Sequence, residues 1–443
     1  MSNLDAVLAR IDADLDHAIE RLFETLRIRS ISTDHAYDAE TRACAEWHAA
    51  DLASIGFEAS VRDTPGHPMV VGHDRSASGP SVLFYGHYDV QPVDPLELWD
   101  DDPFAPSVKT RPDGTKEIRG RGAADDKGQL MTFVEACRAF RAVDGRLPIP
   151  VTVLLEGEEE SGGVNLPPFL DANADELRAD LALICDTNMW DRRTPAITTM
   201  LRGLCAEEIV IHAADRDLHS GFYGSAAANP NHVLARIVAD IHDADGRVAI
   251  PGFYEGVPEL PEALARQWST LGFDVAAFLG EIGLSVPAGE RGRSALEQVW
   301  SRPSCQVNGM GGGYRGEGFK TVIPAVASAK VSFRLVFDQN PAKIREAFRA
   351  FVRERVPADC RVEFIEHGSG VATVFDTSGS AFRKTQAALT QEWGREAVFI
   401  GSGGSIPVTN EIRNRLGMDV VMAGFGLSDD RIHSPNEKYD LVS

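Results

Sequence analysis

The stretch Ser81–Pro92, which reads SVLFYGHYDVQP, decides the fold. It begins with a short apolar run that does not alternate with polar residues, and such runs are typical of strands covered on both faces of a sheet. The run ends at Gly86, and His87 and Asp89 follow at once. Two further apolar runs end in the same way, VTVLL at Val151–Leu155 before Glu156, and DLALIC at Asp180–Cys185 before Asp186.

Helical patterns alternate with these strands. Helices are expected over Leu4–Leu26 and Asp38–Ile55, and over Asp126–Arg141 with Asp125 at the N-cap. This alternation predicts an α/β protein with a mostly parallel central sheet flanked by helices. Ligands of such sheets bind outside the carboxyl ends of the strands. His87, the Glu159–Glu160 pair and Asp186 are therefore expected at one edge of the sheet.

The pattern changes after residue 200 and predicts a compact α+β domain inserted into the first. Residues 201–376 are assigned to this inserted domain, and residues 1–200 and 377–443 to a discontinuous catalytic domain that resumes with a helix and two strands. The expected elements are strands at Ala206–His212, Ala325–Phe337, Val362–Glu366, Ala397–Ile400 and Val420–Met422, and helices at Asn231–Ile241, Pro341–Val356 and Ala381–Gln391.

Composition excludes several classes of function. The 443 residues carry a formal net charge of −22, which repels nucleic-acid phosphates and anionic membrane surfaces. No basic segment followed by an apolar run opens the chain, and no apolar stretch reaches the ~20 residues of a membrane helix. The six cysteines are scattered without a C-x-x-C pair, so free thiols in the cytoplasm are expected.

Histidines and carboxylates after the strands suggest a site for two divalent metals. Asp125 has two oxygens with which to bridge neighbouring ions, His87 with Asp186 suits one ion, and His433 suits the other. Asp89 is placed to accept the second ring N–H of a metal-bound His87. Spacing alone does not decide which of Glu159 and Glu160 binds metal and which remains free as a base.

Several motifs resemble the zinc-dependent exopeptidases of metallopeptidase family twenty, especially its carnosinase and cytosolic nonspecific dipeptidase branch. The resemblance covers nearly the whole chain. It rests on GHYDVQP at Gly86–Pro92, GRGAADDKGQ at Gly120–Gln129, EGEEESGG at Glu156–Gly163, DLHSGFYG at Asp217–Gly224, KTVIPAVASAKVSFRLV at Lys320–Val336, GSGGSIPV at Gly401–Val408 and HSPNEK at His433–Lys438.

The resemblance assigns roles within the catalytic domain. It implies Glu159 as general base, Asp89 as the carboxylate that orients His87, and a cis peptide between Asp125 and Asp126. Family members usually continue into a final helix after the HSPNEK motif, whereas this sequence ends at Ser443. The implied metal ligands are His87, Asp125 as the bridge, Glu160, Asp186 and His433.

The resemblance also makes the inserted domain a lid and dimerisation domain. It implies that His219 reaches across a homodimer to stabilise the oxyanion, and that Arg334 binds the substrate's terminal carboxylate. Asn308 is implied near the substrate, and Gly404 and Ser405 in a loop that contacts the substrate carboxylate.

Together these features predict a cytoplasmic, dinuclear metal-dependent exopeptidase that cleaves dipeptides or short peptides with a free C-terminal carboxylate. Zinc is the expected metal, with manganese or cobalt as alternatives. An N-acyl-amino-acid amidohydrolase remains open within the same chemistry, as does a non-catalytic metal-binding protein of the same fold.

Overall fold

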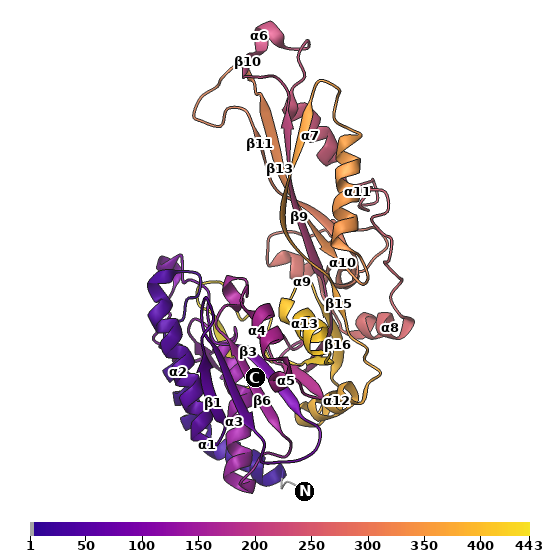
Figure 1. The fold of residues 1–443 in the computed structure, drawn as a ribbon. Coiled ribbons are helices and arrows are strands. Elements are labelled where there is room, and N and C mark those ends of the chain that lie inside the picture. Colours follow the sequence, from indigo (N-terminus) through magenta and orange to yellow (C-terminus); the bar gives the residue numbers. More distant parts are fainter. Residues whose placement is uncertain (1–3) are drawn as a thin grey trace. The chain divides into compact units, whose positions relative to one another are not determined.

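The computed structural model describes residues 4–443, which divide into two compact units (Figure 1). Among the described residues, the first unit comprises residues 4–199, 376–400 and 408–443, and the second comprises residues 200–375 and 401–407. The loop Gly401–Pro407, which the sequence placed in the catalytic domain, thus belongs to the second unit.

The first unit contains a mixed sheet whose centre is parallel. Its central strands are β6 (Val151–Glu156), β3 (Val82–His87), β7 (Leu181–Ile184) and β17 (Val420–Met422), in that order and all parallel. Antiparallel strands flank this centre, namely β1 (Glu58–Arg62) and β2 (Met69–Asp74) beyond β6, and β8 (Ala196–Leu201) beyond β17. Strand β8 also pairs with β16 (Val398–Ser402) and, at its last two residues, with β15 (Thr373–Val374).

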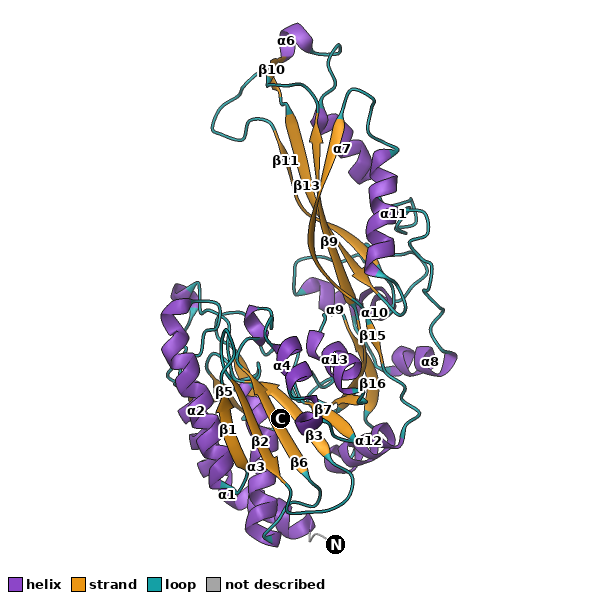
Figure 2. Cartoon of the chain, viewed as in Figure 1, coloured by secondary structure: helices purple, strands orange, loops and turns teal. Residues whose placement is uncertain are grey.

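Helices lie on both sides of this sheet (Figure 2), which confirms the predicted fold class. Helices α2 (Asp38–Ser54) and α3 (Lys127–Asp144) pack on one face, where Phe84 of β3 stacks on Phe133 of α3 at 4.0 Å between ring centroids. Helix α1 (Leu4–Leu26) packs on α3. The remaining helical segments are α4 (Leu166–Ala172), α5 (Ala174–Leu177), α12 (Ser380–Trp393), α13 (Pro407–Glu411) and the π-helical turn η4 (Ile412–Leu416).

A second, small antiparallel sheet in this unit has the strand order β18-β5-β4. It joins the last strand of the chain, β18 (Lys438–Asp440), to β5 (Lys116–Arg119) and β4 (Ser107–Thr110). The segment that carries His433 therefore ends in a strand held by residues more than three hundred positions earlier. The sequence analysis missed this sheet because its strands are short and rich in charge.

The second unit is built on an antiparallel sheet of strand order β11-β13-β9-β14. Burial alternates along β9 and β13, as expected for a sheet with one covered face. Helices α7 (Pro230–Ala239) and α11 (Pro341–Arg353) cover that face around Phe253, Phe333 and Phe348. The strands are β9 (Gly203–His212), β11 (Ser304–Gly312), β13 (Val326–Leu335) and β14 (Arg361–Gly370).

Smaller elements complete the second unit. Strands β10 (Leu218–His219) and β12 (Val322–Ile323) form a two-stranded antiparallel ribbon, and α6 (Ser220–Tyr223) directly follows β10. Three short helices that the sequence analysis did not assign are α8 (Glu262–Thr270), α9 (Val275–Gly280) and α10 (Ala295–Trp300).

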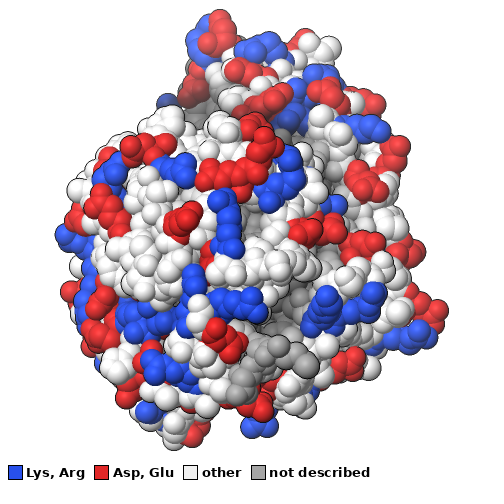
Figure 3. All heavy atoms as spheres, turned by 60° about the horizontal axis from the view of Figure 1, so that its bottom comes forward, with Lys and Arg blue, Asp and Glu red and all other residues white. Residues whose placement is uncertain are grey.

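Surface charge is mixed. On the face shown in Figure 3, acidic and basic side chains are intermingled. Across residues 4–443, no helix combines the length and apolar character needed to cross a membrane.

Burial of His48 in α2 makes the stability of the first unit depend on pH. Its side chain is 1% exposed, and its Nε2 lies 3.0 Å from the Thr25 hydroxyl. Burial, with a smaller contribution from the charge of Lys127, lowers the pKa of His48 to about 3. Below its ordinary pKa, the unfolded chain takes up a proton that the folded chain refuses, so stability falls as pH falls.

We therefore expect His48→Gln to flatten the pH dependence of unfolding. As the pH falls from 6 to 4, the free energy of unfolding of the variant minus that of the wild type should rise by about 1.4 kcal/mol per pH unit, measured by urea denaturation. His35→Gln removes an exposed imidazole and should stay within about 0.5 kcal/mol of wild type at both ends of this range. A His48→Gln profile parallel to wild type would contradict the expectation.

Candidate active site

The carboxyl ends of the parallel strands bring four of the expected side chains to one edge of the sheet. His87 is the last residue of β3, which lies between β6 and β7. Glu159 and Glu160 form the short 3₁₀ turn η3 (Glu159–Ser161) after β6, and Asp186 follows β7 by two residues. The arrangement is the one expected where parallel strands end together.

Asp125 lies between two histidines and directs one oxygen toward each. Its Oδ1 is 3.0 Å from His87 Nε2, and its Oδ2 is 3.0 Å from His433 Nε2. Asp186 Oδ2 lies 3.7 Å from His87 Nε2, and Glu160 Oε2 lies 3.2 Å from His433 Nε2. Two groups of potential ligand atoms, each within 4.8 Å, therefore share Asp125: His87, Asp125 and Asp186; and Asp125, Glu160 and His433.

Several buried carboxyl groups lie close together in this cluster, and a bound cation would stabilise their ionised forms. Burial raises the pKa of Asp186 to about 7, and the neighbouring Asp125 charge adds to the rise. Burial also raises the pKa of Glu159 to about 8. Hydrogen bonds with Asp125 and Glu160 raise the pKa of His433 to about 10. Since buried like charges destabilise one another, bound divalent ions would relieve the strain among these carboxylates, and imidazole with carboxylate suits zinc.

The N-cap of helix α3 differs from expectation. The cap residue is Asp126, not Asp125, and the peptide between them is cis, as the family resemblance implied. Asp126 Oδ2 accepts a hydrogen bond from the His87 backbone N–H at 3.2 Å. Asp125 therefore lies one residue before the N-cap, and each of its two carboxylate oxygens faces one of the histidines.

Asp89 connects the two halves of the site. His87 Nδ1 lies 3.1 Å from the backbone carbonyl of Asp89 and 3.4 Å from its Oδ1, so the carbonyl is the nearer acceptor. The other carboxylate oxygen, Oδ2, accepts hydrogen bonds from the Ser32 hydroxyl at 2.6 Å and from the Glu160 backbone at 3.0 Å. Asp89 thus orients the His87 ring and the backbone of Glu160 together.

The glutamates of the EGEEES run separate by their contacts. Glu158 is buried and accepts hydrogen bonds from Asn165 and from the backbone N–H of His67, so it fastens a loop. Glu160 Oε2 accepts a hydrogen bond from Gln91 Nε2 at 2.8 Å, which leaves its carboxylate turned toward His433. Glu159 has no hydrogen-bonded side-chain partner among the residues that the structure describes.

Glu437 supports the loop that carries Asp125, a role that the sequence analysis missed. Its Oε1 accepts the backbone N–H groups of Ala124 and Asp125 at 2.9 and 3.1 Å. Its Oε2 accepts from Gly122 N–H at 3.0 Å and from Arg121 Nη1 at 2.7 Å. Arg121 and Glu437 are both fully buried, so this pair ties the bridging aspartate to the HSPNEK segment.

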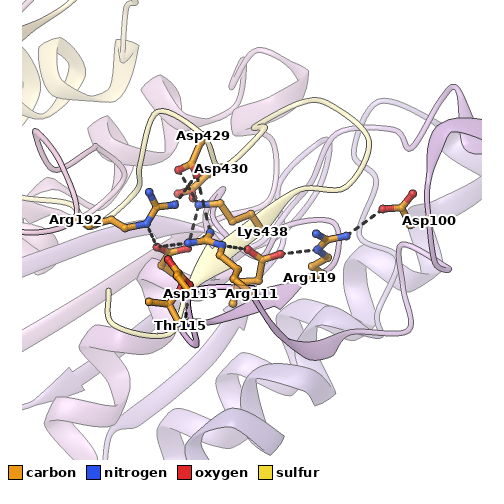
Figure 4. Close-up of polar contacts among 11 residues, drawn as sticks. Asp100, Arg111, Asp113, Thr115, Arg119, Arg192, Asp429, Asp430 and Lys438 are labelled. Carbon is orange, nitrogen blue, oxygen red and sulfur yellow. Dashed lines mark hydrogen bonds and ion pairs between the residues drawn. The ribbon is translucent and has the colours of Figure 1, made fainter. Parts of the chain in front are cut away.

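An ion-pair network holds the same C-terminal segment (Figure 4). Lys438 Nζ contacts Asp429 at 2.9 Å, Asp440 at 3.1 Å and Asp430. Arg192 bridges Asp440 and Asp429 at 2.6 and 2.5 Å. Arg111 links Asp440 to Glu117 of β5. The network encloses a loop with left-handed backbone at Arg431, His433 and Asn436, and so limits where the His433 ring can lie.

The three site residues expected in the inserted domain, His219, Asn308 and Arg334, lie in the second unit, and Gly404 and Ser405 lie there as well. His219 is exposed, and its Nδ1 accepts the Gly221 backbone N–H at 3.0 Å at the start of α6. Asn308 sits at a β-bulge where the pairing of β11 with β13 shifts register. Arg334 lies on the uncovered face of β13, with Nη1 3.4 Å from Ser405 Oγ. Gly404 accepts a backbone hydrogen bond from Arg202 at 3.1 Å.

The fold and the paired histidine–carboxylate groups define a metal-dependent hydrolase. The sequence profile of peptidase family M20/M25/M40 matches residues 83–443. The chain belongs to this family, and the resemblance to metallopeptidase family twenty is confirmed.

Relatives and solved structures agree with this assignment. The chain is 30% identical to the Cys-Gly metallodipeptidase of Candida albicans over 96% of its own length and 90% of the relative's. It is similar to the structure of an M20 family metallo-carboxypeptidase from Sulfolobus solfataricus, with a TM-score of 0.82, 30% identity and coverage of 96% and 95% of the two chains. Human carnosine dipeptidase 1 gives a TM-score of 0.81 at 25% identity, with coverage of 100% and 95%.

We expect Lys438→Met to weaken the first unit and its metal site together. The variant removes the cation paired with the buried Asp430, whereas Asp429 and Asp440 keep Arg192. Leaving the Asp430 carboxylate unpaired should cost about 3–5 kcal/mol of unfolding free energy. Metal affinity should fall about tenfold or more because the His433 loop loses its support. Urea denaturation and titration of chelated protein with zinc measure the two effects.

Lys109→Met is the matched control. Lys109 contacts Asp101 at 2.8 Å, but both side chains are at least 40% exposed. Its loss should change stability by less than about 1 kcal/mol and leave zinc affinity as in wild type. Equal behaviour of the two variants would show that the network has no special role.

Proposed function

We propose that this protein is a dinuclear metal-dependent dipeptidase that hydrolyses dipeptides or short peptides with a free C-terminal carboxylate. The observation that carries the proposal is Asp125, whose two oxygens each lie 3.0 Å from a different histidine. His87 and Asp186 would hold one ion, Glu160 and His433 the other, and Asp125 would bridge them. Bound there, divalent ions supply Lewis acidity and make water a better nucleophile near neutral pH.

Three residues around this centre carry out proton transfer, orientation of His87 and stabilisation of the oxyanion. Glu159, which is not needed as a ligand, takes a proton from the attacking water and passes it to the leaving amine. Burial raises the pKa of Glu159 to about 8, and bound cations would lower it, so that the carboxylate is ionised and can accept the proton. Asp89 keeps the His87 ring in place, and His219 from a partner subunit stabilises the oxyanion.

The substrate class follows from Arg334 and from the relatives. A guanidinium suits bidentate binding of a carboxylate, and Arg334 lies beside the Gly403–Ser405 loop. The Candida relative is named for Cys-Gly, and a human relative, 30% identical over 81% of this chain, for Beta-Ala-His. These names support a dipeptide substrate and favour it over the N-acyl-amino-acid alternative.

Zinc is the metal that we propose, with manganese and cobalt as alternatives, because histidine and carboxylate ligands suit all three. We further propose a cytoplasmic location. All six cysteines are free thiols, and five of them are buried, which is the usual state of cysteines in a reducing compartment.

The test is Glu159→Gln in metal-loaded protein. Removing the base should lower kcat for an Ala-Gly or Cys-Gly dipeptide by about 10²–10⁴-fold, while elemental analysis still finds two metal ions per chain. Glu158→Gln, in the same run of glutamates, should lose less than tenfold because Glu158 only fastens a loop. Unchanged dipeptide turnover by Glu159→Gln would refute the mechanism, and wild-type turnover of N-acetyl amino acids alone would refute the substrate class.

We also propose that a homodimer forms through the second unit. His219 is exposed beside the Phe222 ring, with centroids 4.5 Å apart, and Phe222 and Phe319 are 82% and 91% exposed. Large exposed aromatic side chains of this kind support a contact site between proteins.

In sedimentation velocity, the wild type should be a dimer and the double variant Phe222→Ser, Phe319→Ser a monomer with strongly reduced turnover. Val286→Ser, at a 74% exposed position, should leave both properties unchanged. A fully active wild-type monomer would disprove the dimer and the role of His219.

A further inference from the structure

Two arginines of the second unit, Arg202 and Arg334, form hydrogen bonds with the same loop. Arg202 directly precedes β9, and Arg334 of β13 pairs with Leu204 in the register of these neighbouring strands. The loop Gly403–Ser405 returns to the same place. Arg334 contacts its Ser405 hydroxyl at 3.4 Å, and Arg202 makes three hydrogen bonds with it.

Arg202 fixes the shape of this loop with its backbone and its side chain. Its N–H donates to the Gly404 carbonyl at 3.1 Å, and its Nε donates to the Gly403 carbonyl at 3.1 Å. Its own carbonyl accepts a hydrogen bond from the Ser405 hydroxyl. The approach is close, since a Cβ at Gly403 would lie 3.0 Å from Arg202 Nη2.

The two guanidinium groups have no counter-charge. Among residues 4–443, no carboxylate lies within ion-pair distance of Arg202 or Arg334, whereas most other arginines of the second unit have one. Among the same residues, the terminal nitrogens Nη1 and Nη2 of Arg202 donate no hydrogen bond. Burial, reinforced by the charge of Arg334, lowers the pKa of Arg202 to about 10. Two adjacent, partly buried cations without an anion form a site prepared for one.

We propose that Arg202 is the second guanidinium of the substrate-carboxylate site, where it binds the C-terminal carboxylate together with Arg334 and the Gly403–Ser405 loop. This inference rests on the proposed dipeptidase function. It gives Arg202 two tasks, holding the loop and supplying charge. The site therefore selects substrates with a free C-terminal carboxylate over substrates with a neutral C-terminal group.

The experiment compares Ala-Gly with its C-terminal carboxamide, using metal-loaded protein. Arg202→Met should lower kcat/KM for Ala-Gly at least tenfold, mainly through KM, and change that for the carboxamide less than threefold. Arg202→Lys keeps the charge and should recover much of the acid-to-amide preference. Arg361→Met, which removes a 65% exposed arginine of β14, should match wild type on both substrates.

A merely structural role for Arg202 predicts a different pattern. The proposal is overturned if Arg202→Met lowers kcat/KM equally for the acid and the amide. It is also overturned if Arg202→Lys shows no greater preference for the acid than Arg202→Met. A wild type that hydrolyses neither compound refutes the dipeptidase function instead. Calorimetric titration of metal-free protein with Ala-Gly then decides: binding weakened at least tenfold by Arg202→Met supports the site, and unchanged or absent binding overturns it.

Discussion

The shared carboxylate of Asp125 is the constraint around which the first unit is organised. For its two oxygens to face two histidines, the backbone before α3 must present Asp125 outward, while Asp126 takes the N-cap position. That placement depends on Glu437, which accepts the backbone N–H groups of Ala124 and Asp125 from a segment at the other end of the sequence. The candidate ligands, the loop that carries Asp125 and the C-terminal strand are therefore linked by hydrogen bonds into one structure.

Sequence reasoning predicted that most of these side chains would lie together because strand ends can be recognised from short patterns. His87 and Asp186 follow apolar runs, and parallel strands place such positions together whatever their separation along the chain. The runs at β3 and β6 are unusually clear, since nearly all residues of these two strands are buried. The predicted α/β class followed from them directly.

The remaining features depend on contacts that no local pattern records. The hydrogen bond from Gln91 to Glu160 and that from Ser32 to Asp89 join residues 69 and 57 positions apart. Strand β11 escaped notice because its Gly-rich sequence has no apolar run, although it carries Asn308 at a bulge. Arg202 looked like an ordinary residue before a strand, and only its placement beside Arg334 and the Gly403–Ser405 loop shows an unbalanced pair of charges.

The position of β17 bears on how the chain is assembled during synthesis. This strand lies between β7 and β8 in the sheet, yet it is made more than two hundred residues after either of them. Most of the second unit, by contrast, is one continuous segment, residues 200–375. A ribosome therefore releases most of the second unit while the central sheet of the first still has a vacant place. Since domains fold as units while pairing of distant strands is slow, the second unit can fold first. The proposed metal centre, which would use His433, can form only after the segment that carries His433 has emerged.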